Sequence, residues 1–183
     1  MKRFKIPGAV AVVAILGLGL ALLDRSPYWL KDWLLYGLLL ALGVGITWGV
    51  WKTTGKSPRA GWTALVAAAT RLIIGVSLML LLPVAGYSNN ESHSSGYFYH
   101  DAMWRDNKAW QLANSGRPLT QAFTNELGGD QYGGMLAFSA AIYRWLSLDV
   151  HRPYLILILN AAAAACGTLF LWLGARLWFG EAV

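Results

Sequence analysis

The sequence predicts an all-α fold, a polytopic transmembrane helical bundle with about five spans and a structured outer loop that carries a short interfacial helix. Composition is the first observation behind this prediction. Of the 183 residues, 56% are hydrophobic and only 13% are charged, whereas soluble domains carry about 25% charged residues. The second observation is a series of long apolar runs, and the third is the alternation of charge between them. Lipid is therefore expected to be the solvent for most of the chain.

Five apolar runs approach the length of about 20 residues that crosses a bilayer as a helix. The first follows three basic residues and lacks a small-x-small cleavage site, so we expect an uncleaved anchor rather than a removed signal. The second has tryptophans at both ends, where interfacial belts place them. The fourth is short and marginal. In chain order the runs are Ile6–Leu23, Trp33–Trp51, Trp62–Gly86, Tyr132–Leu148 and Tyr154–Gly180.

The start of the third span is open to two interpretations. A span that starts at Trp62 would place Arg71 deep in lipid, at a cost of a few kcal/mol at least. The alternative, which we favour, starts the span near Arg71 and lays residues 59–70 along the membrane interface.

Charge between the runs predicts their orientation. Three basic residues precede the first run, the segment Asp24–Asp32 is neutral, and Lys52–Gly61 has three basic residues and no acid. The long segment Tyr87–Gln131 has three basic and five acidic residues, a net charge of −2. By the positive-inside rule, the N-terminus is cytoplasmic and residues 87–131 lie outside. We expect an integral protein of a bacterial inner (plasma) membrane.

The net charge of +6 does not indicate a nucleic-acid partner. Basic residues stand in short clusters between apolar runs and form no basic face or stripe. Such clusters are typical of topology signals rather than of phosphate-backbone contacts. Membrane lipid is the expected partner, and oligomeric state is not predicted.

The outer loop contains the stretch GYFYHDAMWRDNKAWQLANSG, residues 96–116. Apolar residues recur there at helical spacing, and Gly116 is a natural helix stop. Trp and Tyr side chains would anchor such a helix at headgroup level. Asp101 falls at its start, where a carboxylate suits the helix dipole. In a purely structural interpretation, Asp106 is a solvated charge paired with Lys108 or Arg105.

The spacing along this stretch resembles the first outer loop of the polyprenyl-phosphate-dependent membrane glycosyltransferases of the GT-C type, a class that includes dolichyl-phosphate-mannose-protein mannosyltransferases. That loop commonly has the pattern D-x-x-x-Y-x-x-x-A-x-x-L-x-x-S-G, and a later span typically closes with A-R-x-L-F-G. The resemblance covers roughly residues 71–180. The residues that carry it are Asp101, Trp104 and Arg105 around the aromatic position, Ala109, Leu112 or Ala113, Ser115–Gly116, and the closing GARLWFG, Gly174–Gly180.

The resemblance implies two segments. Residues 1–61 would hold two N-terminal transmembrane helices and a basic cytoplasmic loop. Residues 62–183 would form the GT-C-like segment, with the third span, the outer loop 87–131 and the fourth and fifth spans. Because the family continues through several further spans, we expect this chain to be the N-terminal portion of a longer enzyme and the portion alone to be inactive.

The activity implied is transfer of a sugar from a polyprenyl-phosphate donor to an acceptor hydroxyl at the outer membrane face. A carboxylate must take the hydroxyl proton, and cations must hold the phosphate leaving group. Asp101 is the first candidate for the general base and Asp106 the second. The candidate substrate-binding residues are Arg105, Lys108, Arg117 and His100.

No cofactor is expected beyond the lipid-linked donor. His93 and His100, with Asp101 adjacent, suggest a metal site only weakly, because polar loops often hold such residues without a metal. The alternative hypothesis is a non-catalytic polytopic membrane protein, a scaffold or a subunit of a complex, in which the loop binds a partner or covers the bundle. A transporter ranks lower, since only Arg71 and Asn160 are strongly polar within the bodies of the runs, whereas Arg144 and Arg176 lie near run ends, where they can snorkel.

Overall fold

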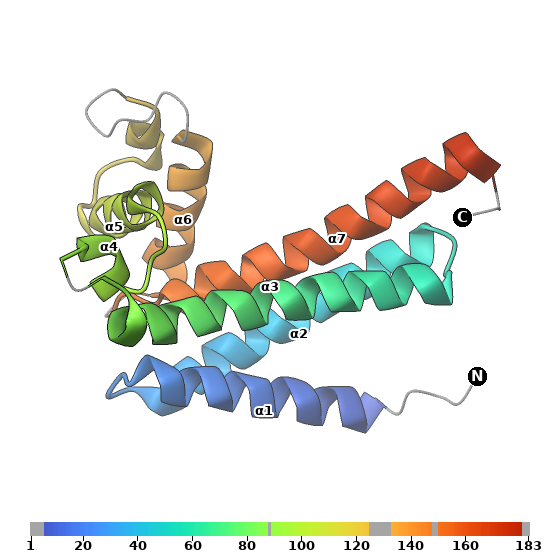
Figure 1. Cartoon of the computed structure of the whole chain (residues 1–183), viewed down its shortest axis with the longest axis horizontal. Coiled ribbons are helices and arrows are strands. Elements are labelled where there is room, and N and C mark those ends of the chain that lie inside the picture. The colour runs from blue at the N-terminus through green and yellow to red at the C-terminus, as the bar shows by residue number, and fades with distance from the viewer. Residues whose placement is uncertain (1–5, 88, 125–132, 148–149, 181–183) are drawn as a thin grey trace. The chain divides into compact units, whose positions relative to one another are not determined.

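The computed structural model describes residues 6–87, 89–124, 133–147 and 150–180. It is 84% helical, and the part of the chain that it describes contains no strand, which confirms the predicted all-α class. In chain order the elements (Figure 1) are α1 (Ile6–Asp24), α2 (Trp29–Thr53), α3 (Pro58–Ala85), α4 (Glu91–Ser94), α5 (His100–Asn114), the 3-10 helix η1 (Leu119–Phe123), α6 (Gly133–Leu146) and α7 (Pro153–Phe179).

Three helices, α2, α3 and α7, are long and apolar enough to cross a membrane. They contain most of the second, third and fifth predicted runs, and they make the chain a helical membrane protein. The apolar part of α1 that the structure describes, Gly8–Asp24, is shorter. Helix α6 has 14 residues, which extend about 21 Å against a hydrocarbon core of about 30 Å. The total of five spans stays a prediction.

Helix α3 runs without interruption for 28 residues. It begins at Pro58, because proline suits the first turn of a helix, where its missing N–H costs nothing. Arg71 lies on an exposed position of this helix. The two proposed lipid boundaries, at Trp62 and at Arg71, therefore lie on one continuous helix.

The chain forms two compact units, which we describe separately. The first unit comprises Met1–Ile74 and Leu157–Val183, and the second comprises Gly75–Ile156. Each of α3 and α7 contributes to both units. The predicted segments 1–61 and 62–183 followed topology and resemblance rather than packing, and they stay a prediction.

Close backbone contact joins α1 to α2 in the first unit. A Cβ atom at Gly17 would lie 3.0 Å from the backbone nitrogen of Gly37. The indole N–H of Trp33 donates to the carbonyl oxygen of Ala14 at 2.9 Å. Small residues let transmembrane backbones approach in this way, where dispersion rather than hydrophobic burial drives association.

Helices α2, α3 and α7 pack together through small side chains. The turn between α2 and α3 is closed by the indole N–H of Trp51, which donates to the carbonyl oxygen of Ser57 at 2.8 Å. Gly55 has a φ of 95° in this turn, a conformation that favours glycine. The buried core of this group consists of Ala60, Ala64, Ala165 and Leu169.

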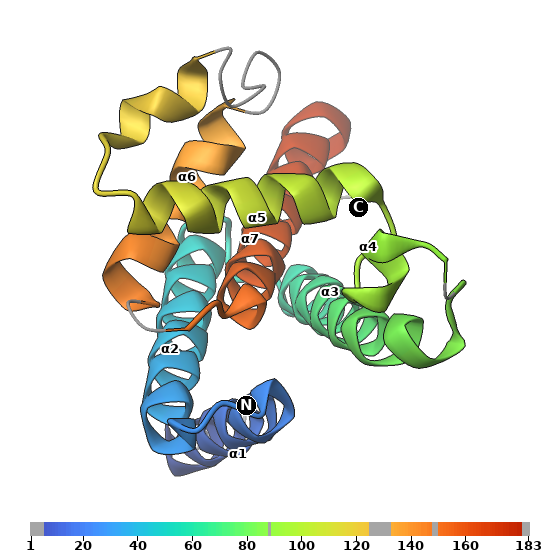
Figure 2. The same ribbon diagram turned by 90° about the vertical axis from the view of Figure 1, so that its left-hand side faces the viewer.

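In the second unit, α5 crosses α6 rather than running alongside it (Figure 2). Helix η1 packs against both. The first turn of α6 comes so close to η1 that a Cβ atom at Gly133 would lie 3.0 Å from the carbonyl oxygen of Ala122. The core of the unit consists of Ala109, Leu112, Ala113, Ala122, Leu136, Ala140 and Tyr143.

Replacing Gly17 by alanine tests the α1–α2 contact. The added methyl group would overlap backbone atoms of Gly37, and overpacking of this kind costs about 1–3 kcal/mol of unfolding free energy. Gly19→Ala is the matched control, because a Cβ atom there meets nothing within 4 Å. We expect detergent–SDS unfolding, followed by circular dichroism, to show a loss for Gly17→Ala alone. Equal stability of the two variants would contradict the packing.

Candidate functional site

The helix predicted in the outer loop is present as α5, His100–Asn114. It ends as predicted, because Gly116 has a φ of 68° and glycine takes this left-handed conformation readily after a helix. Asp101 lies in the first turn and is exposed. A carboxylate there interacts favourably with the helix dipole. The placement of α5 at a membrane interface stays a prediction.

Asp106 lies on the inner face of α5 and is only 9% exposed. Its neighbours on that face include Ala109 and Ala113, which belong to the core of the second unit. A charged carboxylate removed from water is strongly destabilising unless hydrogen bonds or opposite charges compensate it. The structure supplies three such contacts.

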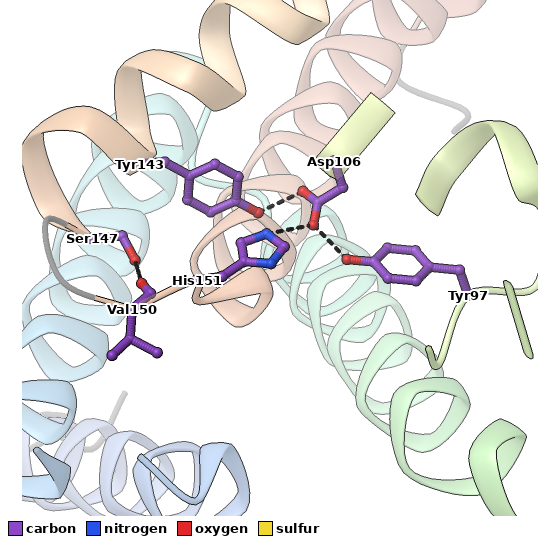
Figure 3. Close-up of polar contacts among 6 residues, drawn as sticks. All are labelled: Tyr97, Asp106, Tyr143, Ser147, Val150 and His151. Carbon is purple, nitrogen blue, oxygen red and sulfur yellow. Dashed lines mark hydrogen bonds and ion pairs between the residues drawn. The ribbon is translucent and has the colours of Figure 1, made fainter. Parts of the chain in front are cut away.

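Three side chains from different segments converge on this carboxylate (Figure 3). The hydroxyl group of Tyr97, in the segment before α5, donates a short hydrogen bond to Oδ2. The hydroxyl group of Tyr143, on α6, donates to Oδ1 at 2.5 Å. Nε2 of His151, which precedes α7, lies 2.9 Å from Oδ2. We call these four residues the Asp106 cluster.

The His151 contact differs in kind from the two tyrosine contacts. Its Nε2 atom is buried and makes no aligned hydrogen bond, although Oδ2 is within ion-pair distance. The contact is therefore a close approach of the ring nitrogen to the carboxylate rather than a directed hydrogen bond. The His151 side chain is 25% exposed, whereas its Nε2 atom, which faces Asp106, is buried.

Aromatic rings cover the cluster. The indole of Trp110 stacks on the imidazole of His151, with 5.3 Å between ring centroids and 22° between planes. Tyr143 meets Trp110 edge to face, with centroids 5.8 Å apart, and meets His151 in the same manner at 5.0 Å. Edge-to-face pairs of this kind contribute roughly 0.5–1.5 kcal/mol beyond their buried area.

The segment before α5 fixes the position of Tyr97. Gly96 has a φ of 83°, and a Cβ atom there would lie 3.0 Å from Cα of Met79 on α3. The next backbone N–H, that of Tyr97, donates to the carbonyl oxygen of Ser92 at 2.8 Å. Only glycine combines this conformation with such a close approach. Gly96 therefore directs the Tyr97 ring toward α5.

Burial raises the pKa of the Tyr97 hydroxyl far above its ordinary value, and the charge of Asp106 and the hydrogen bond to it act in the same direction. The phenol therefore keeps its proton and donates a hydrogen bond to the carboxylate of Asp106.

The far end of α5 is held by Arg144 of α6. Its guanidinium donates to the carbonyl oxygens of Leu112 at 2.8 Å and Ala113 at 3.2 Å. It also donates to the carbonyl oxygen of Arg117 at 2.6 Å. The first two acceptors lie in the last turn of α5 and the third lies just beyond it, in a region where carbonyl groups lack partners within the helix and a cation is favourable.

The connection that carries His151 is closed by its own polar contacts. The hydroxyl group of Ser147 donates a short hydrogen bond to the carbonyl oxygen of Val150 (Figure 3). The guanidinium of Arg152 donates to the same carbonyl at 3.3 Å. These contacts restrict the backbone on either side of His151.

The structure brings some of the predicted site residues together and separates others. Asp101, Arg105 and Lys108 follow one another at four- and three-residue spacing on α5, so they share one stripe of the helix. The ammonium group of Lys108 lies 5.8 Å from the centroid of the Trp104 ring.

The remaining two candidates lie elsewhere on the segment. His100 is the first residue of α5 and is exposed. Arg117 is exposed beyond the C-terminal end of the helix, and its carbonyl oxygen accepts a hydrogen bond from Arg144. Among the residues that the structure describes, no three His, Cys, Asp or Glu side chains gather at a position that could hold a metal ion.

The interpretation of Asp106 as a solvated charge is wrong, since the residue is buried and bonded within its cluster. Sequence reasoning did not single out Tyr97, Tyr143, His151 or Trp110. One signal was present, because Asp106, Ala109 and Ala113 form an i, i+3, i+7 series in which the acid shares the apolar face. An acid on such a face requires partners.

No family model, no curated protein and no solved structure matches this chain.

Replacing Asp106 by asparagine tests the cluster. The amide can accept only one of the two tyrosine hydrogen bonds, so a buried hydroxyl loses its acceptor at a cost of about 1–3 kcal/mol. We expect trypsin to cut faster after Arg105 and Lys108 and unfolding to need less denaturant. Asp101→Asn, at an exposed position, should change the unfolding free energy by less than about 0.5 kcal/mol. Equal behaviour of the two variants would contradict the assigned role.

Alkaline unfolding tests the proton on Tyr97. An unfolded phenol ionises near its ordinary pKa of 10.0, whereas the folded phenol, with its raised pKa, keeps its proton. The contribution of this hydroxyl group to the free energy of unfolding is therefore complete below about pH 10. Above that pH it falls by up to about 1.4 kcal/mol per pH unit. Stability of Tyr97→Phe should decline less steeply over the same range. Parallel declines would show that Tyr97 ionises normally in the folded protein.

Proposed function

We propose that this chain is the N-terminal part of an integral-membrane glycosyltransferase, which moves a sugar from a polyprenyl-phosphate donor to an acceptor hydroxyl at the outer membrane face. One observation carries the proposal. An exposed carboxylate, Asp101, and two cations, Arg105 and Lys108, share a stripe of a short helix, and that helix belongs to a chain with membrane-spanning helices.

The reaction assigns a separate task to each group on this stripe. Asp101 takes the proton of the acceptor hydroxyl, whose oxygen then attacks the anomeric carbon of the sugar. The bond between that carbon and the phosphate oxygen breaks, and polyprenyl phosphate leaves with the electron pair. Arg105 and Lys108 stabilise the charge on the departing phosphate. Arg117 and His100, at the two ends of the segment, are further contacts for the donor or the acceptor.

The Asp106 cluster supports this assignment indirectly. Both carboxylate oxygens of Asp106 already accept hydrogen bonds from tyrosine hydroxyl groups, and the side chain is buried, so an acceptor sugar has little access to it and its contacts suit an anchoring role. Asp101 has an exposed side chain on the same helix and stays available for proton transfer. We therefore assign general-base catalysis to Asp101 and positioning of α5 to Asp106.

The proposal includes a topology. The N-terminus would be cytoplasmic, residues 87–131 would lie outside, and α1 and α6 would complete five spans in a bacterial inner membrane. In this arrangement α5 lies at the interface, where the phosphate of a lipid donor is found. A polyprenyl chain stays in the bilayer while its phosphate reaches the surface, so a catalytic acid must lie at that depth.

The alternative is a non-catalytic membrane scaffold or complex subunit. The contacts that the Asp106 carboxylate makes with Tyr97, Tyr143 and His151 are also consistent with this alternative. The same contacts would rigidify a loop that has only a structural role. The two hypotheses differ in what Asp101 contributes.

Sugar transfer from synthetic undecaprenyl-phosphate hexoses separates them. The protein would be assayed within its complete open reading frame, in detergent, with radiolabelled donors. Asp101→Asn should lower the transfer rate by about 10²- to 10⁴-fold while the unfolding curve stays unchanged. Glu91→Gln, at an exposed acid of the same outer segment, is the matched control and should retain activity. Transfer that survives in Asp101→Asn would refute the assignment of the base, and folded protein that neither binds nor uses these donors would favour the scaffold.

A further inference from the structure

The first unit contains an apolar cavity of roughly 420 Å³. Residues of α1, α2, α3 and α7 line it, among them Val12, Leu40, Leu65 and Leu169. Its volume falls within the range of about 300–1,000 Å³ typical of small-molecule sites. None of the residues that line it carries a charge.

Small residues keep this cavity open. Gly43, Ala68, Ala69 and Ala161 form part of its walls, and larger side chains at these positions would fill it. An empty apolar space forfeits the dispersion contacts of its lining. Because the chain spans a membrane, the material that surrounds these helices and can fill the space is hydrocarbon.

Positive charge lies at one end of the cavity. Trp48 and Trp51 belong to its lining, and the ammonium group of Lys52 lies 3.5 Å from the centroid of the Trp48 ring. Trp51 is bonded to the carbonyl oxygen of Ser57, which places the α2–α3 turn at the same end. The guanidinium of Arg176 approaches this turn so closely that a Cβ atom at Gly55 would lie 2.5 Å from it.

The turn itself adds to this charge. Lys56 and Arg59 are exposed, and no acidic residue occurs between Lys52 and Gly61. Lys56 has a φ of 55°, a conformation that costs a non-glycine residue free energy and that sets it in the turn closed by Trp51. An apolar cavity with basic side chains and tryptophans at one end matches an anionic lipid, which has a hydrocarbon chain below a phosphate.

We propose that this cavity binds one acyl chain of an anionic phospholipid, whose phosphate contacts Lys52 and Lys56 at the α2–α3 turn. The first unit forms this site alone, and it uses none of Asp101, Arg105 or Lys108. It is therefore independent of sugar transfer. The bound lipid fills the space between the helices and holds the turn at the level of the headgroups.

Native mass spectrometry in detergent tests the site with two synthetic phospholipids of identical chains, phosphatidylglycerol and phosphatidylcholine. The wild-type protein should retain one molecule of phosphatidylglycerol in preference to phosphatidylcholine. Ala69→Phe, which places a ring in the cavity from an exposed position of α3, should weaken retention by about tenfold or more, since excluding two methylene groups from an apolar site costs about that factor. Ala163→Phe is the matched control, at an exposed position of α7 outside the lining.

Charge variants test the headgroup separately. Lys52→Gln combined with Lys56→Gln should remove the preference for phosphatidylglycerol while some retention of either lipid continues. Arg25→Gln, an exposed cation in the turn between α1 and α2, should leave the preference unchanged. Equal retention by Ala69→Phe and wild type would overturn the chain site, and equal binding of the two lipids by wild type would overturn the preference of the basic turn for an anionic headgroup. Loss of retention in Ala163→Phe as well would show adsorption to the apolar surface in general and would also overturn the proposal.

Discussion

The buried carboxylate of Asp106 is the constraint on which the second unit depends. Removing a carboxylate from water costs several kcal/mol unless it is fully compensated, and the compensation comes from residues 9, 37 and 45 positions away along the chain. The segment before α5, helix α6 and the connection to α7 must therefore meet at one point. A polar stretch that would otherwise have little to order it is fixed against the apolar face of α6 in this way.

This arrangement separates the two acids of α5. Five residues apart, they lie roughly 140° from each other around a helix of 3.6 residues per turn. Asp106 faces the core and has both oxygens occupied, whereas Asp101 is exposed beside Arg105 and Lys108. The two carboxylates of this short helix therefore differ in environment: Asp106 is held in the core by two tyrosine hydroxyl groups, and Asp101 is exposed to solvent.

Sequence reasoning succeeded where the signal is local. Helices α2, α3 and α7 follow from apolar runs, and α5 follows from helical spacing and from Gly116 as a stop. It failed where the contact is distant in sequence. Nothing near Asp106 identifies Tyr143 on another helix as its donor, and Arg144, which hydropathy alone places at the end of a span, binds the carbonyl groups of α5 instead. Helix α6 illustrates both cases. Its apolar run predicted the helix, whereas the contacts of its 14 residues with α5 and η1 could not be predicted from the sequence.

The two units are stabilised by different kinds of interaction. This difference explains why the second unit encloses a carboxylate and the first unit contains a cavity. In the second unit, hydrogen bonds to a buried carboxylate require defined partners at short range, so Asp106 is enclosed, whereas Asp101 on another side of α5 is exposed. In the first unit, close approaches at small residues, such as Gly17 to Gly37 and Gly43 to Ala162, bring helices together without interlocking large side chains. Between helices in lipid, apolar burial provides no drive to fill every space, because hydrocarbon solvates apolar walls well. A cavity that would destabilise a water-soluble core is therefore stable here, provided that a lipid chain occupies it.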